Sequence, residues 1–372
     1  MGARGTVVLS PQALNRALLS RQLLLGRVDL GVSEATEHLF GLNAQDPDLA
    51  YFALWNRLER FAIQDLTVAI ERGVLVRSTM MRATQHLMSA ADFRLVRPVL
   101  APLLRRVQRN AFGGRTTGVD LVELVADAAE LLDGGVLTRP ELGRALARTR
   151  PGADAQALGR TVQYLLALVH PAPSGTWGKR GATPFAVFPG VPETATSDDV
   201  RELIRRYLAA FGPATVADAR TWSGVSGLRE VFEHLRPELR TYTDEAGREL
   251  FDLPDHEIPS PDVPAPVRLL AEFDATLLAH ADRTRVMTEP IRRQVCQGAA
   301  VAATVLVDGT VAATWTKDRT GALTVVPLRS ISATDREAIE AEALRLLEFA
   351  APDAVHDVRF SEWPTDEEMP RV

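Results

Sequence analysis

Residues 74–88 of this chain read Val74-Leu75-Val76-Arg77-Ser78-Thr79-Met80-Met81-Arg82-Ala83-Thr84-Gln85-His86-Leu87-Met88. Branched and apolar side chains are frequent in 74–79 and 82–88, which predicts two β-strands around a tight connection. Ahead of them, apolar residues recur at helical spacing, which predicts four helices. These helices are expected at residues 11–25, 33–42, 49–61 and 65–72. Helices followed by a hairpin are typical of a winged helix.

The same order of elements returns in residues 116–195 after a long helix that begins at Ser89. Thr138-Arg139-Pro140-Glu141 forms a capping box with proline in the first turn, which predicts a helix start. A recognition helix is expected at 154–169. The Gly-rich basic loop at 174–181 follows it in the position of a wing.

A third round fills residues 196–260, and the chain then changes character. Its helices are expected at 199–211, after Thr215 and at 228–235, with hairpin strands at 241–243 and 249–252. Beyond a proline-rich linker at 254–266, three strands and a helix predict a small α+β domain. The expected fold is therefore an α-rich α+β protein with three tandem winged-helix units around a DNA channel, plus this C-terminal domain. The expected boundaries are 1–115, 116–195, 196–260 and 261–372.

Composition narrows the class of protein. Hydrophobic residues make up 46% of the 372 residues and charged residues 24%, which is ordinary for a globular chain and argues against disorder. Cys296 is the single cysteine, no leader peptide opens the chain, and no apolar run is long enough for a membrane span. We therefore expect a cytoplasmic protein without a membrane anchor.

The charge balance at first argues against nucleic-acid binding. The formal net charge is -6, whereas proteins that bind DNA commonly carry a basic surplus. Nearly every positive charge is an arginine, since Lys179 and Lys317 are the only lysines. Coding bias explains this composition, and an arginine-lined channel within an acidic protein is equally consistent with it. No phosphate-binding loop, metal cluster or nucleophile elbow is present in the sequence, so no cofactor and no metal are expected.

Several segments, in order, resemble one known family. They are Gly41-Leu42-Asn43-Ala44-Gln45-Asp46-Pro47, Leu54-Trp55-Asn56-Arg57-Leu58, residues 76–87, Arg205-Arg206-Tyr207-Leu208, Gly212-Pro213-Ala214-Thr215, His280-Ala281-Asp282-Arg283-Thr284-Arg285 and residues 304–309. Together they resemble the AlkZ/YcaQ-type winged-helix DNA glycosylases over most of the chain. The resemblance implies a monomeric enzyme that removes alkylated purines, such as bulky N7-alkylguanine, from double-stranded DNA. In producers of DNA-alkylating antibiotics such enzymes provide self-resistance.

The resemblance also implies catalytic residues. The family's active-site triplet is Gln, an apolar residue, then Gln or Asp, and it falls here on Asn43, Ala44 and Gln45. The chain departs at Asn43, whose carboxamide is one methylene shorter. Gln45 is expected to position the attacking water and Asn43 to complete the contacts to water or sugar, with Asp46 as an alternative base. Without the resemblance, these residues would be ordinary helix-end and turn residues.

Candidate DNA contacts lie in three places, each with a structural alternative. Arg77 and Arg82 are expected to contact backbone phosphates, and His86 either contacts phosphate or lesion or is a buried structural histidine. Trp177, Lys179 and Arg180 form either a DNA-binding wing or a solvated turn. Arg283 and Arg285 line the channel or form surface ion pairs. We expect Asn43, Gln45 and His86 to face one basic concavity.

Two other functions compete with base excision. The first is a non-catalytic winged-helix regulator, which Asn43 would suit, although regulators usually dimerise to match operator half-sites. The second is a protein-interaction scaffold, which the acidic net charge would suit. Aromatic residues are only 6% of the chain, which favours an open channel over an aromatic base-flipping pocket.

Overall fold

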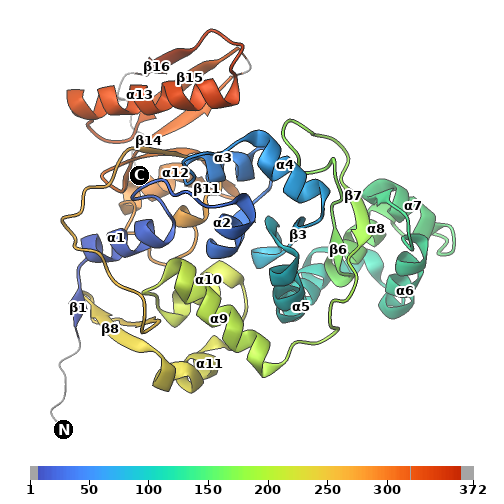
Figure 1. Cartoon of the computed structure of the whole chain (residues 1–372). Helices are drawn as coiled ribbons and strands as arrows, with labels where there is room; N and C mark the ends of the chain where they lie inside the picture. Colours follow the sequence, from blue (N-terminus) through green and yellow to red (C-terminus); the bar gives the residue numbers. More distant parts are fainter. Residues whose placement is uncertain (1–6, 319, 362–372) are drawn as a thin grey trace.

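The computed structural model describes residues 7–318 and 320–361, which form a helix-rich α+β fold. In Figure 1 the first segment (residues 11–89) lies at the centre, the helices within residues 121–165 lie at one side, and the helices within residues 197–235 lie below. A sheet with the helix of residues 333–350 lies at the top. Within the described ranges, no helix is both long and apolar enough to cross a membrane.

The four helices expected at the start of the chain are present, and each of them ends earlier than expected. They are α1 (Pro11–Arg21), α2 (Val32–His38), α3 (Leu49–Trp55) and α4 (Ile63–Glu71). Ser10 caps α1 by accepting a hydrogen bond from the Ala13 amide at 3.1 Å. The prediction that the second helix runs to Leu42 and presents Asn43 and Gln45 at its end is wrong. Phe40 and Gly41 adopt positive φ angles of 54° and 93°, which ends the helical turn and leads the chain into a strand.

That strand joins the expected hairpin to make a small sheet. Strand β3 (Leu75–Thr79) pairs antiparallel with β4 (Gln85–Ser89), and β2 (Leu42–Asn43) pairs with the other edge of β4. The hairpin is confirmed, but its second strand begins at Gln85 instead of Arg82. Arg82 and Ala83 form the turn, because both take left-handed φ angles, 55° and 61°.

The long helix α5 (Ala90–Phe112) connects this sheet to the second segment. That segment contains α6 (Leu121–Leu131), α7 (Arg139–Ala147), α8 (Ala155–Leu165) and a sheet in the order β5-β7-β6, built from Leu137–Thr138, Pro184–Val187 and Leu168–Val169. The capping box at Thr138 is confirmed. The expected recognition helix ends at Leu165, because residues beyond it pair with β7. Gly159 allows α7 and α8 to cross closely, since a Cβ there would lie 2.8 Å from the Arg139 carbonyl oxygen.

The third segment follows the expected pattern within two residues. Its elements are α9 (Ser197–Phe211), α10 (Val216–Ser223), α11 (Leu228–Leu235), β8 (Arg240–Asp244) and β9 (Glu249–Asp252). Strand β1 (Val8–Leu9), which the sequence did not reveal, adds to β8 in parallel. Helices and a small sheet thus occur in all three segments, and the number of winged helices among them stays a prediction.

The C-terminal part contains a mixed sheet in the order β10-β13-β14-β15-β16. Its strands are Arg268–Leu270, Thr304–Val307, Thr310–Lys317, Ala322–Pro327 and Asp357–Phe360, and α13 (Ala333–Ala350) packs against them. Before β13 lie α12 (Glu289–Val295) and a small hairpin of β11 (Cys296–Gln297) and β12 (Ala300–Val301).

Apolar side chains of α3 enter the core of this C-terminal sheet. Leu49, Phe52 and Trp55 pack with residues of β10, β13 to β15 and α13. Burial of such large side chains contributes about 2 kcal/mol each. This packing holds the chain after β10, at 271–275, against the loop that carries Asn43.

Candidate active site

The triplet 43–45 begins on a strand and ends in a bend. Asn43 pairs with His86 across β2 and β4, and the Ala44 amide donates to the Gln85 carbonyl at 2.9 Å. Ala44 enters the apolar core of the first segment, whereas Gln45 lies in the bend that follows the strand and is exposed. The two carboxamides therefore flank a buried apolar residue at the end of β2.

Asn43 is 7% exposed and borders a small cavity of about 10 Å³. This volume is about what one water molecule requires. Three kinds of polar group surround it: carboxamides, a buried ion pair and a carboxylate. They belong to Gln22, Asn43, Arg57, Glu272 and Asp274.

The expectation of a basic concavity at the triplet is wrong for this cavity. Arg57 forms a buried bidentate ion pair with Asp274, at 2.9 and 3.0 Å, which neutralises its charge. Glu272 then adds one negative charge. His86 does not line the cavity.

Arg82 connects the hairpin turn to both Asn43 and the third segment. One guanidinium nitrogen donates to the Trp222 carbonyl at 2.5 Å and the other to the Asn43 Oδ1 at 3.5 Å. Burial lowers the pKa of Arg82 to about 10, with a smaller contribution from the charge of Arg283. The geometry thus gives Arg82 a contact with the triplet, and its expected contact with phosphate stays a prediction.

Arg77 forms hydrogen bonds to the backbone of the triplet. Its side chain donates to the Ala44 carbonyl at 2.8 Å and the Gln45 carbonyl at 3.2 Å. Only 7% of the residue is exposed, and burial lowers its pKa to about 10. These contacts indicate that Arg77 positions the triplet backbone, because little of its guanidinium is left for a phosphate.

His86 is 2% exposed, and its Nδ1 lies 3.1 Å from the Thr84 carbonyl oxygen. A carbonyl only accepts, so Nδ1 carries the hydrogen and Nε2 is left as an acceptor. Burial, and secondly the charge of Arg82, lower the pKa of His86 to about 3, and the hydrogen bond to Thr84 offsets only a part of this shift. A neutral, buried imidazole fits the structural alternative better than a phosphate contact.

Gln45 differs from Asn43 in being exposed. Its Oε1 accepts a long hydrogen bond, 3.4 Å, from the Gln85 amide. The Nε2 of Gln45 makes no hydrogen bond to another described residue, so the amide can turn toward a substrate.

The loop at 174–181 does not extend as a free wing. Trp177 packs edge-on against Tyr51 and Phe349, with ring centroids 5.3 and 5.5 Å apart. Arg180 bridges Asp46 and Asp48 at 2.9 and 2.8 Å. Lys179 is exposed, and among the three residues its side chain is the one that remains open to phosphate.

Arg283 and Arg285 also make internal contacts. Arg283 donates to the Cys296 sulfur at 2.9 Å, and Arg285 donates to the Pro213 carbonyl at 3.2 Å. Burial lowers the pKa of Arg285, which is 7% exposed. Arg285 is therefore a core residue, and a role in the channel remains a prediction for Arg283.

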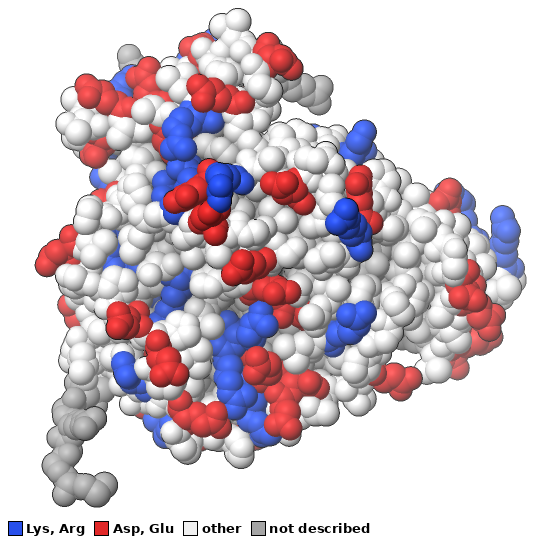
Figure 2. All heavy atoms as spheres, in the orientation of Figure 1, with Lys and Arg blue, Asp and Glu red and all other residues white. Residues whose placement is uncertain are grey.

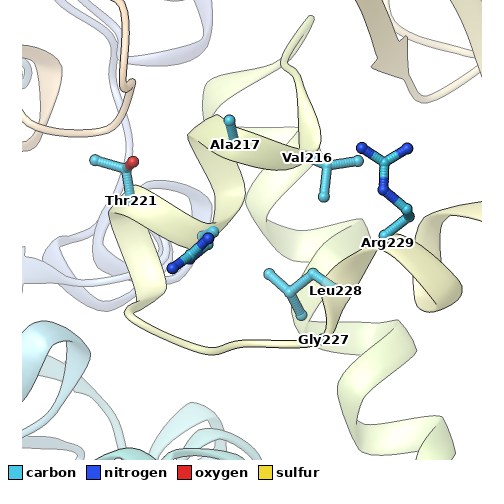
Figure 3. A pocket seen from close by; sticks show the side chains of 7 residues that line it. Val216, Ala217, Thr221, Gly227, Leu228 and Arg229 are labelled. Atoms are coloured by element: carbon cyan, nitrogen blue, oxygen red, sulfur yellow. The ribbon is translucent and has the colours of Figure 1, made fainter.

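A groove in the third segment carries two arginines that the sequence did not single out. It lies between α10 and α11, has a volume of about 540 Å³, and is lined by Val216, Ala217, Arg220, Thr221, Gly227, Leu228 and Arg229 (Figure 3). Arg220 and Arg229 are exposed, and neither forms a salt bridge with another described residue. Two helices joined by the left-handed residues Gly224 and Gly227 were a usable signal, because such helix-turn-helix pairs commonly contact DNA.

Charge on the visible surface is mixed. Figure 2 shows acidic and basic side chains interspersed over the face that it presents, without a large field of one sign. Electrostatic attraction to DNA must then come from local groups such as this groove, since a basic face is the usual long-range attractor.

A helix-rich α+β fold in which the carboxamide of Asn43 borders a water-sized cavity, with the exposed carboxamide of Gln45 two residues away, suits an enzyme that hydrolyses a bond in a large substrate. The DNA glycosylase AlkZ-like family model matches residues 36–349, so the chain belongs to that family. The protein is thus a DNA glycosylase of the DNA-repair class, and membership favours this function over a non-catalytic regulator.

Two relatives from Streptomyces sahachiroi extend the comparison. A protein described as an interstrand DNA cross-link repair glycosylase is 26% identical over 331 residues, which cover 80% of this chain and 85% of that protein. The solved structure of the DNA glycosylase AlkZ superimposes with a TM-score of 0.80 at 24% identity, and covers 95% of this chain and 100% of that one. The second likeness supports the fold over nearly the whole length.

Proposed function

We propose that this protein is a monofunctional DNA glycosylase that hydrolyses the N-glycosidic bond of alkylated purines, with bulky N7-alkylguanine adducts as substrates. The observation that carries the proposal is the placement of Asn43, at the end of strand β2, beside a cavity of about 10 Å³, with the exposed Gln45 two residues further along the chain. The relative described as an interstrand cross-link repair glycosylase supports large adducts, including crosslinks, as targets.

The chemistry suits carboxamides because the leaving group needs little acid assistance. Alkylation at N7 places a positive charge on guanine and weakens its bond to the sugar. The enzyme must then stabilise an oxocarbenium-like sugar and hold a water molecule. Asn43 and Gln45 can do both through their amide oxygens, although neither can take up a proton.

Hydrolysis without strand cleavage fits the scarcity of lysine side chains and their absence from the lining of the cavity beside Asn43. Bifunctional glycosylases use an amine nucleophile, and this chain has only Lys179 and Lys317. Neither lysine lines the cavity beside Asn43. Water is therefore the nucleophile in our proposal.

Duplex DNA is expected to contact the groove of Arg220 and Arg229, together with Lys179 and the accessible part of Arg283. Neutralising phosphates in a few places is compatible with the net charge of -6. We further propose that the enzyme acts as a monomer in the cytoplasm and protects its host against a DNA-alkylating natural product.

The proposal is tested with duplex DNA that carries one N7-alkylguanine adduct, followed by detection of alkali-labile abasic sites. Wild-type protein should produce abasic sites without added metal or cofactor, and Gln45→Ala should slow excision by about 100-fold. Binding without abasic sites on any alkylated duplex would disprove the activity. Full activity of Gln45→Ala would disprove only the role of this residue.

A further inference from the structure

The chain that follows β10 brings a carboxylate to the triplet. Ala271 and Glu272 border the small cavity beside Asn43, and they also border a larger cleft of about 510 Å³. The larger cleft contains Asp46, the residue after Gln45. Glu272 therefore lies where the two cavities meet.

Glu272 differs from the other carboxylates of these cavities in having no hydrogen-bond or salt-bridge partner among residues 7–318 and 320–361. Asp46 and Asp48 bind Arg180, Asp274 binds Arg57, and Asp318 accepts hydrogen bonds from Thr320 and Ala322. Among the residues that the structure describes, none donates a hydrogen bond to Glu272 or forms a salt bridge with it. Its oxygens are thus available to a water molecule, whereas those of Asp46 are held by a guanidinium.

The backbone beside Glu272 is strained. Phe273 takes a φ of 59°, a left-handed conformation that costs an aromatic residue about 1 kcal/mol or more. Strain of this kind persists where surrounding contacts enforce it, and it is frequent at functional sites. The buried ion pair between Asp274 and Arg57 is the contact that holds the loop.

We propose that Glu272 is the general base that takes a proton from the attacking water, which Asn43 holds in the cavity between them. This inference rests on the proposed glycosylase function and adds a residue from outside the triplet. It assigns a proton acceptor to a site whose two carboxamides cannot serve as one.

The reaction balances without a co-reactant. The bond between the sugar C1′ and the purine N9 breaks, and its electron pair neutralises the positive charge of the alkylated base. The water oxygen forms a bond to C1′, and one water proton moves to Glu272. The products are the free N7-alkylpurine, an abasic sugar with a 1′-hydroxyl group, and a proton that Glu272 later releases to solvent.

The surroundings of Glu272 favour this role. Partial desolvation, and secondly the negative charge of Asp46, raise the pKa of Glu272 above its ordinary value. A carboxylate with a raised pKa is a stronger base. The other charged groups nearby are the neutral pair of Arg57 with Asp274, the set of Arg180 with Asp46 and Asp48, which keeps one net negative charge, and Lys317 and Asp318 at the outer cleft.

The experiment compares Glu272→Gln with wild type in single-turnover excision of an N7-alkylguanine adduct across pH. Glutamine keeps the size of the side chain and can still accept a hydrogen bond from the attacking water, but it cannot take up a proton, so excision should slow by about 100-fold. The wild-type rate should fall as the pH drops through the pKa of Glu272, and this acidic limb should be absent in the variant. DNA affinity should not change.

Two further variants give controls. Glu340→Gln alters an exposed glutamate of α13 that lines neither cavity, and should excise at the wild-type rate. Glu272→Ala should regain part of its activity in added formate, which a merely structural defect would not.

Separate outcomes test the two proposals. Two outcomes overturn the role of Glu272 and leave the glycosylase function standing. The first is an active wild type with an excision rate of Glu272→Gln within threefold of it. The second is a slower Glu272→Gln that keeps the acidic limb, together with no rescue of Glu272→Ala by formate. An inactive wild type on every alkylated duplex overturns the proposed function and this inference together.

Discussion

The first and third segments both consist of helices followed by a hairpin, yet the first buries polar side chains of its hairpin and the third exposes polar side chains at its surface. The hairpin β3–β4 buries Arg77 and His86 within the protein, and its turn consists of Arg82 and Ala83 in left-handed conformation. The hairpin β8–β9 turns through Gly247, with a φ of 79°, at the surface. The first arrangement stores strain and supports the triplet, whereas the third segment leaves Arg220 and Arg229 exposed to solvent. Similar secondary structure thus supports a site in one segment and a surface for DNA in the other.

The largest expected difference between the segments concerns excision. Arg82→Ala removes the donor to Asn43 and to the Trp222 carbonyl, which should slow excision by about 30-fold, or about 2 kcal/mol. The matched change Arg240→Ala, at the exposed start of β8, should leave the rate within twofold. Equal rates for both variants in single-turnover assays would remove the functional contrast between the hairpins.

The second expected difference is in acid sensitivity. The pKa of His86 is about 3 in the folded protein, against an ordinary value of 6.5, so the unfolded chain binds a proton that the folded one does not. Stability is then complete above pH 6.5 and falls toward pH 3 by about 1.4 kcal/mol per pH unit for each such histidine. His170 and His280, also with a pKa of about 3, add to the slope. Denaturant unfolding between pH 7 and 5 should show a shallower slope for His86→Asn, and an unchanged slope would contradict a neutral His86.

The third expected difference is in DNA binding. Replacing Arg220 and Arg229 together by alanine should weaken binding to any duplex by about 1 kcal/mol. It should also reduce the slope of affinity against salt by about 0.9 for each phosphate that the variant no longer neutralises. Unfolding of the variant should match wild type, because neither side chain has a salt bridge within the described chain. If the dependence of DNA affinity on salt concentration equals that of wild type, the DNA does not contact the groove of Arg220 and Arg229.

The smallest expected difference concerns the two turns. Gly247→Ala should destabilise the protein by about 1 kcal/mol, since alanine disfavours positive φ and no atom lies within 4 Å of the added Cβ. Ala83→Gly should change stability by less than about 0.5 kcal/mol, because the relief of strain offsets the extra freedom of the unfolded chain. Thermal or denaturant unfolding measures both. A larger loss for Ala83→Gly would show that its backbone is not strained.

Local signals account for most of the elements that the sequence predicted. Ser10 and Thr138 at helix starts and the turn at Gly247 all appear as expected. Errors lie at element ends, as at Asn43, where a strand replaced the expected helix end. Asn43 pairs with β4 there instead of continuing the helical pattern. The neighbouring residues give no signal of a strand partner some 40 positions away in the chain.

The site was predicted in part. Asn43 and Gln45 were predicted through a resemblance, and their catalytic role stays a prediction. The proposed base Glu272 had no signal in the sequence, because an isolated glutamate after a short strand is ordinary. Arg77, Arg285 and Trp177 were expected to contact DNA, but burial and packing give them internal partners. A sequence shows that a side chain is charged or aromatic and does not show how much of it reaches solvent.

By itself, the sequence determined where helices start, where hairpins turn and which triplet carries two carboxamides, because caps, glycines and alternation act within a few residues. Only the tertiary structure decided which polar groups meet. It brought Glu272 to the cavity beside Asn43, joined Arg180 to Asp46 and left Arg220 and Arg229 exposed. These outcomes depend on the packing of α3 against the C-terminal sheet and of the hairpin turn against α10, which are contacts between residues far apart in the chain.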